Sequence, residues 1–255
     1  MQGQVQRLWQ ELAGLVLPVA CAGCGRPRTE LCAECNRALT RDGHGARRVR
    51  LRAAPVGLPR VWAAAPYADE VRAVLLAHKE RGALRLAGPL GAALAGAVRG
   101  LRPGRGALLI PVPSARGAVA GRGHDPVRRI ALAAAGALRR EGVGEGAGVG
   151  ARMLAVLRRR RPVADQAGLN APQRLANVAG ALEVPGAAGR LLTGRPVVLV
   201  DDLVTTGATL AEAARAVAVA GGRVSGAAVV AAPGSAFGND VIFPGRRGRE
   251  SPRSE

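Results

Sequence analysis

The sequence predicts an α/β fold in which a mostly parallel sheet is flanked by helices and preceded by a small cysteine-bearing module. Short apolar runs are repeatedly followed by polar turns and helical segments, which is typical of strands buried between helices. Of the 255 residues, 48% are apolar, enough for a sizeable core, but only 2% are aromatic. We therefore expect a core of Ala, Val and Leu.

Residues 1–18 are expected to form an amphipathic helix. Its apolar side chains recur at helical spacing with polar residues between them, and they are Val5, Leu8, Trp9, Leu12, Leu15 and Val16. Packing against the body of the protein fits this pattern better than a membrane surface, because the polar face is not strongly basic.

Residues 19–45 hold all four cysteines, as two CxxC pairs: Cys21, Cys24, Cys32 and Cys35. Two such closely spaced pairs are typical of the two knuckles of a tetrahedral, structural zinc site. A reducing compartment disfavours disulfides, and a redox CxxC is expected at a helix start in a βαβ unit. His44 is either a spare ligand or a solvated loop histidine.

Residues 46–60, rich in Gly, Arg and Pro, are predicted to be a linker to a domain at 61–232. Four strands are expected in this domain, in addition to the run at Val197–Val200 (Val61–Tyr67, Ala107–Ile110, Met153–Leu157 and Val224–Ala231). Four helices are expected (Asp69–Lys79, Leu84–Val98, Val127–Arg140 and Ala208–Val219). Beyond Pro233 the chain is predicted to be a disordered basic tail, 233–255.

The segment 115–125 is predicted to be a loop between a strand end and a helix, where ligands bind in open α/β sheets. Arg122, flanked by glycines, could clamp a diphosphate. Asp125 and Pro126 are expected to start the next helix. His124 is either a loop histidine or a catalyst, and Lys79 either favours its helix C-terminus or contacts a ligand.

The stretch 195–210, RPVVLVDDLVTTGATL, carries the clearest chemistry. An apolar strand ends in Asp201 and Asp202, and a short turn leads into a helix. Hydroxyls and free backbone N–H groups at such a turn favour a phosphate; the residues that supply them are Thr205, Thr206, Gly207, Ala208 and Thr209. The two carboxylates suit either the vicinal hydroxyls of a ribose or a divalent cation. Together they predict a pocket for a ribose 5-phosphate, whereas the simpler alternative is a strand–turn–helix with Asp and Thr as caps. No GxxxxGK sequence occurs, which excludes a P-loop.

The formal net charge is +19, and Lys79 is the only lysine, so the charge is nearly all arginine. Such a balance indicates either a nucleic-acid or other anionic partner, or a coding bias that scatters arginines over the surface. No apolar run approaches the roughly 20 residues of a membrane span, and no secretory signal is present. The expected compartment is the cytoplasm.

The stretch 195–210 resembles the phosphoribosyl-diphosphate (PRPP) signature of type I phosphoribosyltransferases. The whole chain, over about residues 5–232, resembles the ComF family, which is associated in some bacteria with DNA uptake during natural competence. This likeness depends on an ordered set of motifs: the two CxxC pairs, His78-Lys79, Pro111–Pro113, Arg122-Gly123, Gln166, Leu169, Arg174, Asn177-Val178 and VVLVDDLVTTGATL.

The resemblance implies a type I phosphoribosyltransferase fold with a zinc-ribbon-like module of four cysteines, and PRPP bound with Mg²⁺. By this likeness Asp201 and Asp202 hold the ribose, residues 205–209 hold the 5-phosphate, and Arg122 lies near the diphosphate. The sequence departs from the family at 122–126, RGHDP in place of RGFNQ, and at Leu182, where the family commonly has an aromatic residue. Roles of the missing Phe, Asn and Gln side chains therefore do not transfer.

Two functions are compatible with these residues. In the first, Asp201, Asp202 and Arg122 are catalytic, and PRPP loses its diphosphate to a nitrogen nucleophile that the sequence does not identify. In the second, the protein binds PRPP without turnover, as a sensor, or acts as an adaptor that contacts single-stranded DNA or proteins of the uptake machinery.

Overall fold

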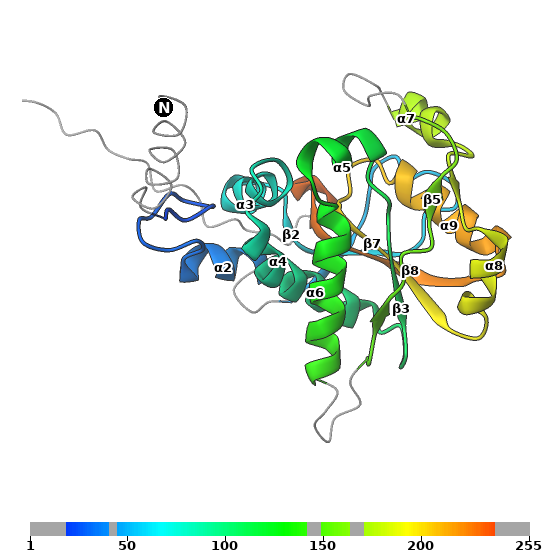
Figure 1. Ribbon diagram of the computed structural model, residues 1–255, viewed down its shortest axis with the longest axis horizontal. Coiled ribbons are helices and arrows are strands. Elements are labelled where there is room, and N and C mark those ends of the chain that lie inside the picture. Colours follow the sequence, from blue (N-terminus) through cyan, green and yellow to red (C-terminus); the bar gives the residue numbers. More distant parts are fainter. Residues whose placement is uncertain (1–18, 41–44, 142–148, 164–170, 238–255) are drawn as a thin grey trace, which may run out of the picture.

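The computed structural model describes residues 19–40, 45–141, 149–163 and 171–237. The predicted helix at 1–18, His44, Gln166 and Leu169 lie outside the described residues. The predicted α/β architecture is confirmed: helices cover both faces of a central sheet (Figure 1).

The central sheet of the described residues has six strands in the order β1-β2-β8-β7-β3-β4. All neighbouring pairs are parallel except β1 with β2. The strands are β1 (Arg47–Val49), β2 (Val61–Pro66), β3 (Leu108–Pro111), β4 (Arg152–Met153), β7 (Pro196–Leu203) and β8 (Arg223–Ala232). A separate antiparallel pair is formed by β5 (Arg158–Arg159) and β6 (Leu182–Glu183).

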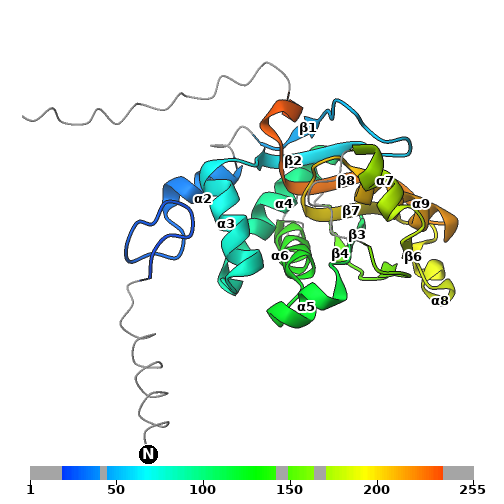
Figure 2. The ribbon, with the colours of Figure 1, turned by 90° about the horizontal axis from the view of Figure 1, so that it is seen from above.

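Two groups of helices cover the sheet (Figures 1 and 2). Those on one face are α3 (Asp69–Glu80), α4 (Ala87–Leu101) and α6 (Pro126–Glu141), with the 3₁₀ turn η2 (Leu84–Leu86) between α3 and α4. Those on the other are α7 (Ala171–Val178), α8 (Gly186–Gly189) and α9 (Ala208–Val219), with the 3₁₀ turn η3 (Arg190–Leu192). The short helix α5 (Arg116–Arg122) precedes α6.

Strand β7 shows why an apolar run without alternation forms a central strand. Val198 and Val200 pack into the core under α4 and α6, while Val197 and Leu199 pack into the core under α9. All four side chains are fully buried, because successive residues of a strand point to opposite faces and both faces are covered.

The core is built from small aliphatic side chains, as the composition predicts. Helices α4 and α6 pack closely at Gly91, where an added Cβ would lie 2.8 Å from the backbone nitrogen of Ala134. With almost no aromatic residues to fill space, close helix packing supplies the necessary density.

The cysteine-bearing module packs on the main domain (Figure 2). Helix α2 (Ala33–Thr40) inserts Leu39, which is fully buried, into the core shared by α3 and α4. Gly23 lies against both Cys35 and Glu70 of α3, so the first knuckle touches the domain directly.

Three sequence predictions about elements were wrong in detail. The predicted linker 46–60 contains β1, and its Leu51 and Leu58 pack on the core. The predicted loop 115–125 contains α5, which ends where Gly123 adopts a φ of 73°. The predicted strand Met153–Leu157 is strand only at Met153, because the chain then leaves β3 and turns toward β5.

The end of the domain also differs from the prediction. The 3₁₀ helix η4 (Gly234–Phe237) follows β8, and Phe237 is buried in the core. Because Phe237 is buried, the packed part of the domain extends five residues past the expected boundary at 232. The rest of the tail lies outside the described residues.

Candidate functional site

The two predicted acids lie within β7, at its carboxyl end. Asp201 pairs in register with Val229 of β8, so the strand extends past the apolar run that predicted it. The backbone N–H of Asp202 donates a hydrogen bond of 2.9 Å to the Asp201 side chain. Burial and the neighbouring charge of Asp202 raise the pKa of the Asp201 carboxyl well above its usual range. The pair therefore places a half-buried and a buried acidic side chain at the sheet edge where ligands bind in open α/β folds.

Lys79, from the end of α3, completes this acid pair. Its Nζ donates to Oδ2 of the largely buried Asp202 at 2.9 Å, across 123 residues of sequence. Burial opposes the charge of Lys79, but the carboxylates of Asp202 and Asp201 raise its pKa above the ordinary value. The sequence left two interpretations of Lys79 open, and the structure shows an ion pair with a candidate site residue.

The turn after β7 leads into the uncapped N-terminus of α9. Gly207 precedes the helix with a φ of 80°, a left-handed conformation that glycine adopts without strain. No side chain caps the helix, and the nearest substitute is a long contact of 3.4 Å from the Ala208 N–H to the Thr206 hydroxyl. The first N–H groups of α9 thus have no side-chain cap and are available to bind an anion.

The loop 51–58 closes over this turn. A Cβ at Gly207 would come within 2.9 Å of Leu58 and 3.1 Å of Leu51. Thr205 is exposed and Thr209 is half-buried beside the helix start. The residues predicted to bind a phosphate, 205–209, therefore run from the turn into the start of α9. Leu51 and Leu58 of the loop 51–58 pack against this turn at Gly207.

Three consecutive residues at the end of α3 each hold a different part of the site. The carbonyl oxygen of His78 lies 3.1 Å from Nε2 of His124, Lys79 pairs with Asp202, and Glu80 pairs with Arg122. The end of α3 therefore ties the acid pair to α5 and to the turn after it.

Arg122 lies at the end of α5 rather than in a loop. Its Nε donates to Glu80 at 3.0 Å, whereas its NH1 is buried without a hydrogen-bond partner among the described residues. Its charge also reaches Lys79. A buried donor with no partner favours an added acceptor, such as a ligand oxygen.

Arg159 belongs to the same site, although the sequence did not single it out. Its Nε donates to the carbonyl oxygen of Pro113 at 3.1 Å, and its charge interacts with Asp201. Burial lowers the pKa of Arg159. The signal in the sequence was the basic block 158–161, but nothing local distinguishes one of four adjacent arginines.

Other predicted residues have mainly structural contacts. Asp125 accepts a hydrogen bond of 3.1 Å from the Arg128 N–H, which confirms it as the N-cap of α6. Leu182 is buried in the core under α9, consistent with a packing change at this position. Arg174 lies on α7 with its Nε buried and unpartnered among the described residues.

A divalent cation fits the acid pair less well than ribose hydroxyls do. Asp202 already accepts from Lys79, which places a positive charge where a directly bound cation would lie. In the described parts of the chain, the four cysteines are the only cluster of three or more His, Cys, Asp or Glu side chains suited to a metal. The described residues around the acid pair therefore do not form a site suited to holding Mg²⁺ through protein ligands alone.

The four cysteines fit a tetrahedral metal. Their sulfur atoms all lie within 4.8 Å of one another, and Cys24 Sγ lies 3.6 Å from Cys32 Sγ. Thiolates bound about 2.3 Å from zinc at tetrahedral angles lie about 3.8 Å apart. The second pair flanks the first turn of α2, a helical placement that the sequence did not predict. The four thiols could therefore hold zinc.

Backbone donors support the thiolate of Cys21. The N–H of Cys32 donates to Cys21 Sγ at 3.3 Å. Burial alone would raise the pKa of Cys21, but backbone hydrogen bonds from Cys24, Cys32 and Gly23 lower the pKa to about 6. Such N–H···S bonds stabilise the anionic form that a metal requires.

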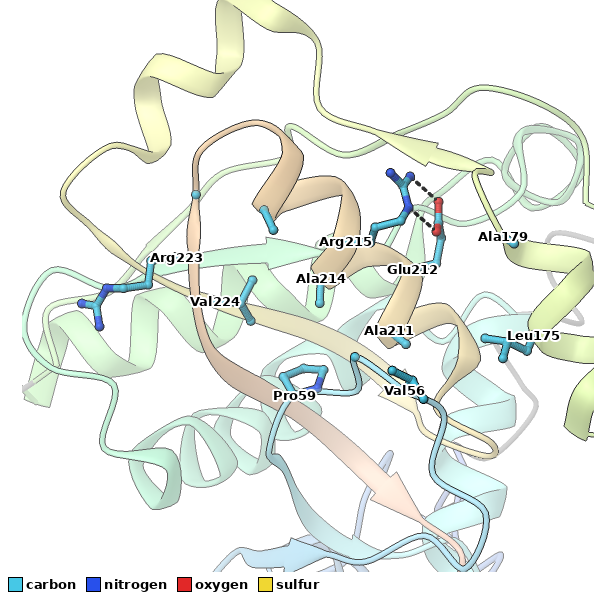
Figure 3. A pocket seen from close by; sticks show the side chains of 13 residues that line it. Val56, Pro59, Leu175, Ala179, Ala211, Glu212, Ala214, Arg215, Arg223 and Val224 are labelled. Carbon is cyan, nitrogen blue, oxygen red and sulfur yellow. Dashed lines mark hydrogen bonds and ion pairs between the residues drawn. The ribbon is translucent and has the colours of Figure 1, made fainter.

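A cavity of about 730 Å³ lies away from the acid pair, beside α9 (Figure 3). Three charged side chains of the described residues line it: Glu212 and Arg215, which pair with each other at 2.7 Å, and Arg223 of β8. Glu212 also accepts from the N–H of Leu182, and Arg215 donates to the Leu182 carbonyl. Glu212 and Arg215 therefore fasten β6 to α9, and neither the acid pair nor the turn before α9 lines this cavity.

The comparison with known families bears on the part of the chain that carries the acids. Residues 148–241 match the family model described as phosphoribosyl transferase domain. The match spans β4 to β8, and it includes the acid pair and the whole turn into α9. It supports the phosphoribosyltransferase-like fold predicted from the sequence. No curated protein matches the chain.

This match leaves the cysteine module and α3 outside its range. The resemblance to the ComF family in particular therefore depends only on the order of the sequence motifs. No helix among the described residues is long and apolar enough to cross a membrane.

Proposed function

We propose that this protein binds PRPP with Mg²⁺ and transfers its phosphoribosyl group to a nitrogen nucleophile. The observation that carries the proposal is the acid pair at the end of β7, directly followed by the uncapped N-terminus of α9. One sugar phosphate can reach both, its hydroxyls on the carboxylates and its 5-phosphate on the backbone N–H groups.

In this proposal Asp201 and Asp202 accept hydrogen bonds from the ribose hydroxyls. Negative charge on the pair, which Asp202 carries in its ion pair with Lys79, stabilises the positive charge that builds on the sugar as its bond to the diphosphate lengthens. Lys79 holds Asp202 in place, and Arg122 offers its unpartnered NH1 to the departing diphosphate. Catalysis then depends on positioning and electrostatics, with Mg²⁺ carried by the diphosphate.

We also propose zinc as the structural metal of the four cysteines, and the cytoplasm as the compartment, because closely spaced thiols persist in a reducing environment. The order of motifs supports membership of the ComF family and, with it, a role in DNA uptake during competence.

A coupled assay for diphosphate release tests the enzyme directly. With PRPP, Mg²⁺ and a panel of nitrogen acceptors, at least one acceptor should increase the rate of diphosphate release from PRPP above the rate measured with water alone. If PRPP binds but no acceptor in the panel promotes release, the transferase proposal fails and binding without turnover remains.

The second candidate, an adaptor for single-stranded DNA, is favoured by the net charge of +19. Phosphate contacts release counterions, so the affinity for a mixed-sequence oligonucleotide should fall steeply between about 50 and 200 mM salt. Absence of binding at low salt would remove the physical basis of the adaptor function. We propose the transferase first, because the acid pair and the uncapped start of α9 offer groups complementary to a sugar phosphate.

A further inference from the structure

A second cavity, of about 270 Å³, lies between α5 and strand β5. Ala115 and Gly117 form one side, and residues 159–163 form the other. Neither the acid pair nor the turn into α9 lines this cavity, so it is a space additional to the one proposed for the sugar phosphate.

The register of the sheet places this cavity beside the acid pair. Strand β3 pairs with β7 so that Pro111 faces Val200, and Val112 N–H donates to the Val200 carbonyl at 2.9 Å. The turn that follows Pro113 therefore runs alongside Asp201. Arg159, which lines the cavity, is tied to the carbonyl of Pro113 and interacts electrostatically with Asp201, so this wall of the cavity lies near the acid pair.

The charges of the cavity are not all compensated. Arg160 pairs with Glu183 at 3.3 Å, and Arg161 donates to the carbonyl oxygens of Asn177 and Ala179. Arg159 makes one hydrogen bond, through Nε, and no carboxylate among the described residues lies within ion-pair distance of it. Its terminal nitrogens are free to bind a planar anion in two-point fashion.

We propose that this cavity is the acceptor subsite, and that it takes a nitrogen heterocycle or aromatic amine carrying a carboxylate, which Arg159 binds. The inference rests on the proposed transferase function. The volume is slightly below the usual range of about 300–1,000 Å³ for drug-sized ligands, so one ring with its carboxylate fits. A nucleic acid would instead call for an extended basic groove with stacking aromatic side chains, and the described residues that line the cavity include no aromatic one.

The reaction at this subsite is a substitution at C1 of the ribose. The acceptor nitrogen forms the new C–N bond as the C1–O bond to the diphosphate breaks. The electron pair of the broken bond leaves with the diphosphate. An acceptor nitrogen that carries a proton loses it to water or to the diphosphate, whereas a pyridine nitrogen carries none and becomes a pyridinium. The carboxylate of the acceptor is not consumed, so its only role is recognition.

Matched pairs of acceptors test the proposal on the full-length protein. Suitable pairs differ mainly in the carboxylate: orotate and uracil, nicotinate and nicotinamide, anthranilate and aniline. With PRPP and Mg²⁺, diphosphate release should be promoted by carboxylated members, with kcat/KM at least about tenfold above that of their uncharged partners. Equal or better use of the uncharged partners, or no use of any carboxylated member, would overturn the inference.

Substitution of Arg159 provides a second test of the acceptor subsite. Arg159→Gln should raise the KM of the carboxylated acceptor at least about tenfold, and Arg159→Lys should recover part of the loss, because it restores charge without two-point geometry. Arg140→Gln, an exposed arginine of α6, serves as the matched control. Unchanged acceptor KM in Arg159→Gln would contradict the assignment.

Calorimetry with PRPP and Mg²⁺ on the same samples separates the two proposals. If PRPP does not bind to the unsubstituted protein, the proposed function itself fails. If PRPP binds and carboxylated acceptors show no advantage, only the acceptor assignment fails.

Discussion

At the scale of single residues, the site depends on one buried carboxylate and its lysine. The Asp202 side chain is 9% exposed, and its ion pair with Lys79 supplies the compensating charge. A buried carboxylate without a partner is costly, whereas a partly exposed lysine loses little when its partner is removed.

Replacement of Lys79 by Met should therefore destabilise the fold by about 1–3 kcal/mol, the cost of leaving a charged hydrogen bond unmade. Urea unfolding at neutral pH measures this change. Lys79→Arg, which keeps the charge, should recover most of the loss. An unchanged unfolding midpoint in Lys79→Met would show that the ion pair contributes nothing to the folded state.

The residue scale is also where sequence reasoning was weakest. Asp201, Asp202 and the turn 205–209 were predictable because a strand, two acids and a glycine turn are adjacent in the sequence. The partners of these groups are not adjacent. Lys79 lies 123 positions from Asp202, and Arg159 has the same local surroundings as its neighbouring arginines.

At the scale of elements, close packing of α4 on α6 holds one face of the sheet. Gly91→Ala should destabilise the protein by about 1–3 kcal/mol, because an added methyl group meets the backbone of α6. Gly96→Ala, in the same helix, is the matched control. Its methyl group would meet only the Arg99 side chain at 3.6 Å, and higher helix propensity should stabilise it by up to about 1 kcal/mol. Equal thermal stability of the two variants would contradict this packing.

The connection between β6 and α9 should give a measurable pH dependence. Burial acts to raise the pKa of Glu212, but hydrogen bonds from Arg215 and Leu182 hold it below the ordinary value of 4.5. A lowered folded-state pKa contributes stability that is present above the unfolded value and is lost as the pH falls through the folded value. The wild type should therefore lose more stability below about pH 4.5 than Glu212→Gln, which does not titrate.

Thermal melts of the two proteins from neutral pH down to about pH 3 make this comparison. The other carboxyl groups titrate equally in the wild type and in Glu212→Gln, so the difference between their stability–pH curves reports on Glu212 alone. Parallel curves would mean that the carboxylate contributes no pH-dependent stability.

The elements themselves were mostly predictable from sequence, for local physical reasons. The helix Ala208–Val219 follows a glycine turn, and the helix after Asp125 has an N-cap and a proline in its first turn. Strand β1 was missed because its three residues lie in a Gly, Arg and Pro-rich segment. It forms only through antiparallel pairing with β2, a tertiary effect.

At the scale of the whole molecule, the cysteine module and the candidate site are linked through α3. The module packs against α3 at Glu70 and inserts Leu39 into the common core, and the far end of the same helix carries Lys79 and Glu80. Zinc is thus expected to stabilise the helix that positions the site.

Cys24→Ser should release zinc and open the module locally. Elemental analysis should find one zinc per chain in the wild type and less in the variant, and hydrogen exchange should increase in α2 and at the start of α3. A wild-type protein that carries no zinc, or a variant with full zinc and unchanged exchange, would contradict the structural role of the metal.

The proposed function of the whole molecule depends most on the acid pair as the site of PRPP. Isothermal titration with PRPP and Mg²⁺ should show binding to the wild type. The double variant Asp201→Asn, Asp202→Asn should bind on the order of 100-fold more weakly or not at all, because each charged hydrogen bond contributes about 1.5–3 kcal/mol. Glu141→Gln, a surface control, should bind as the wild type does. Unchanged PRPP affinity in a double variant that is still folded would contradict the assignment of the acid pair.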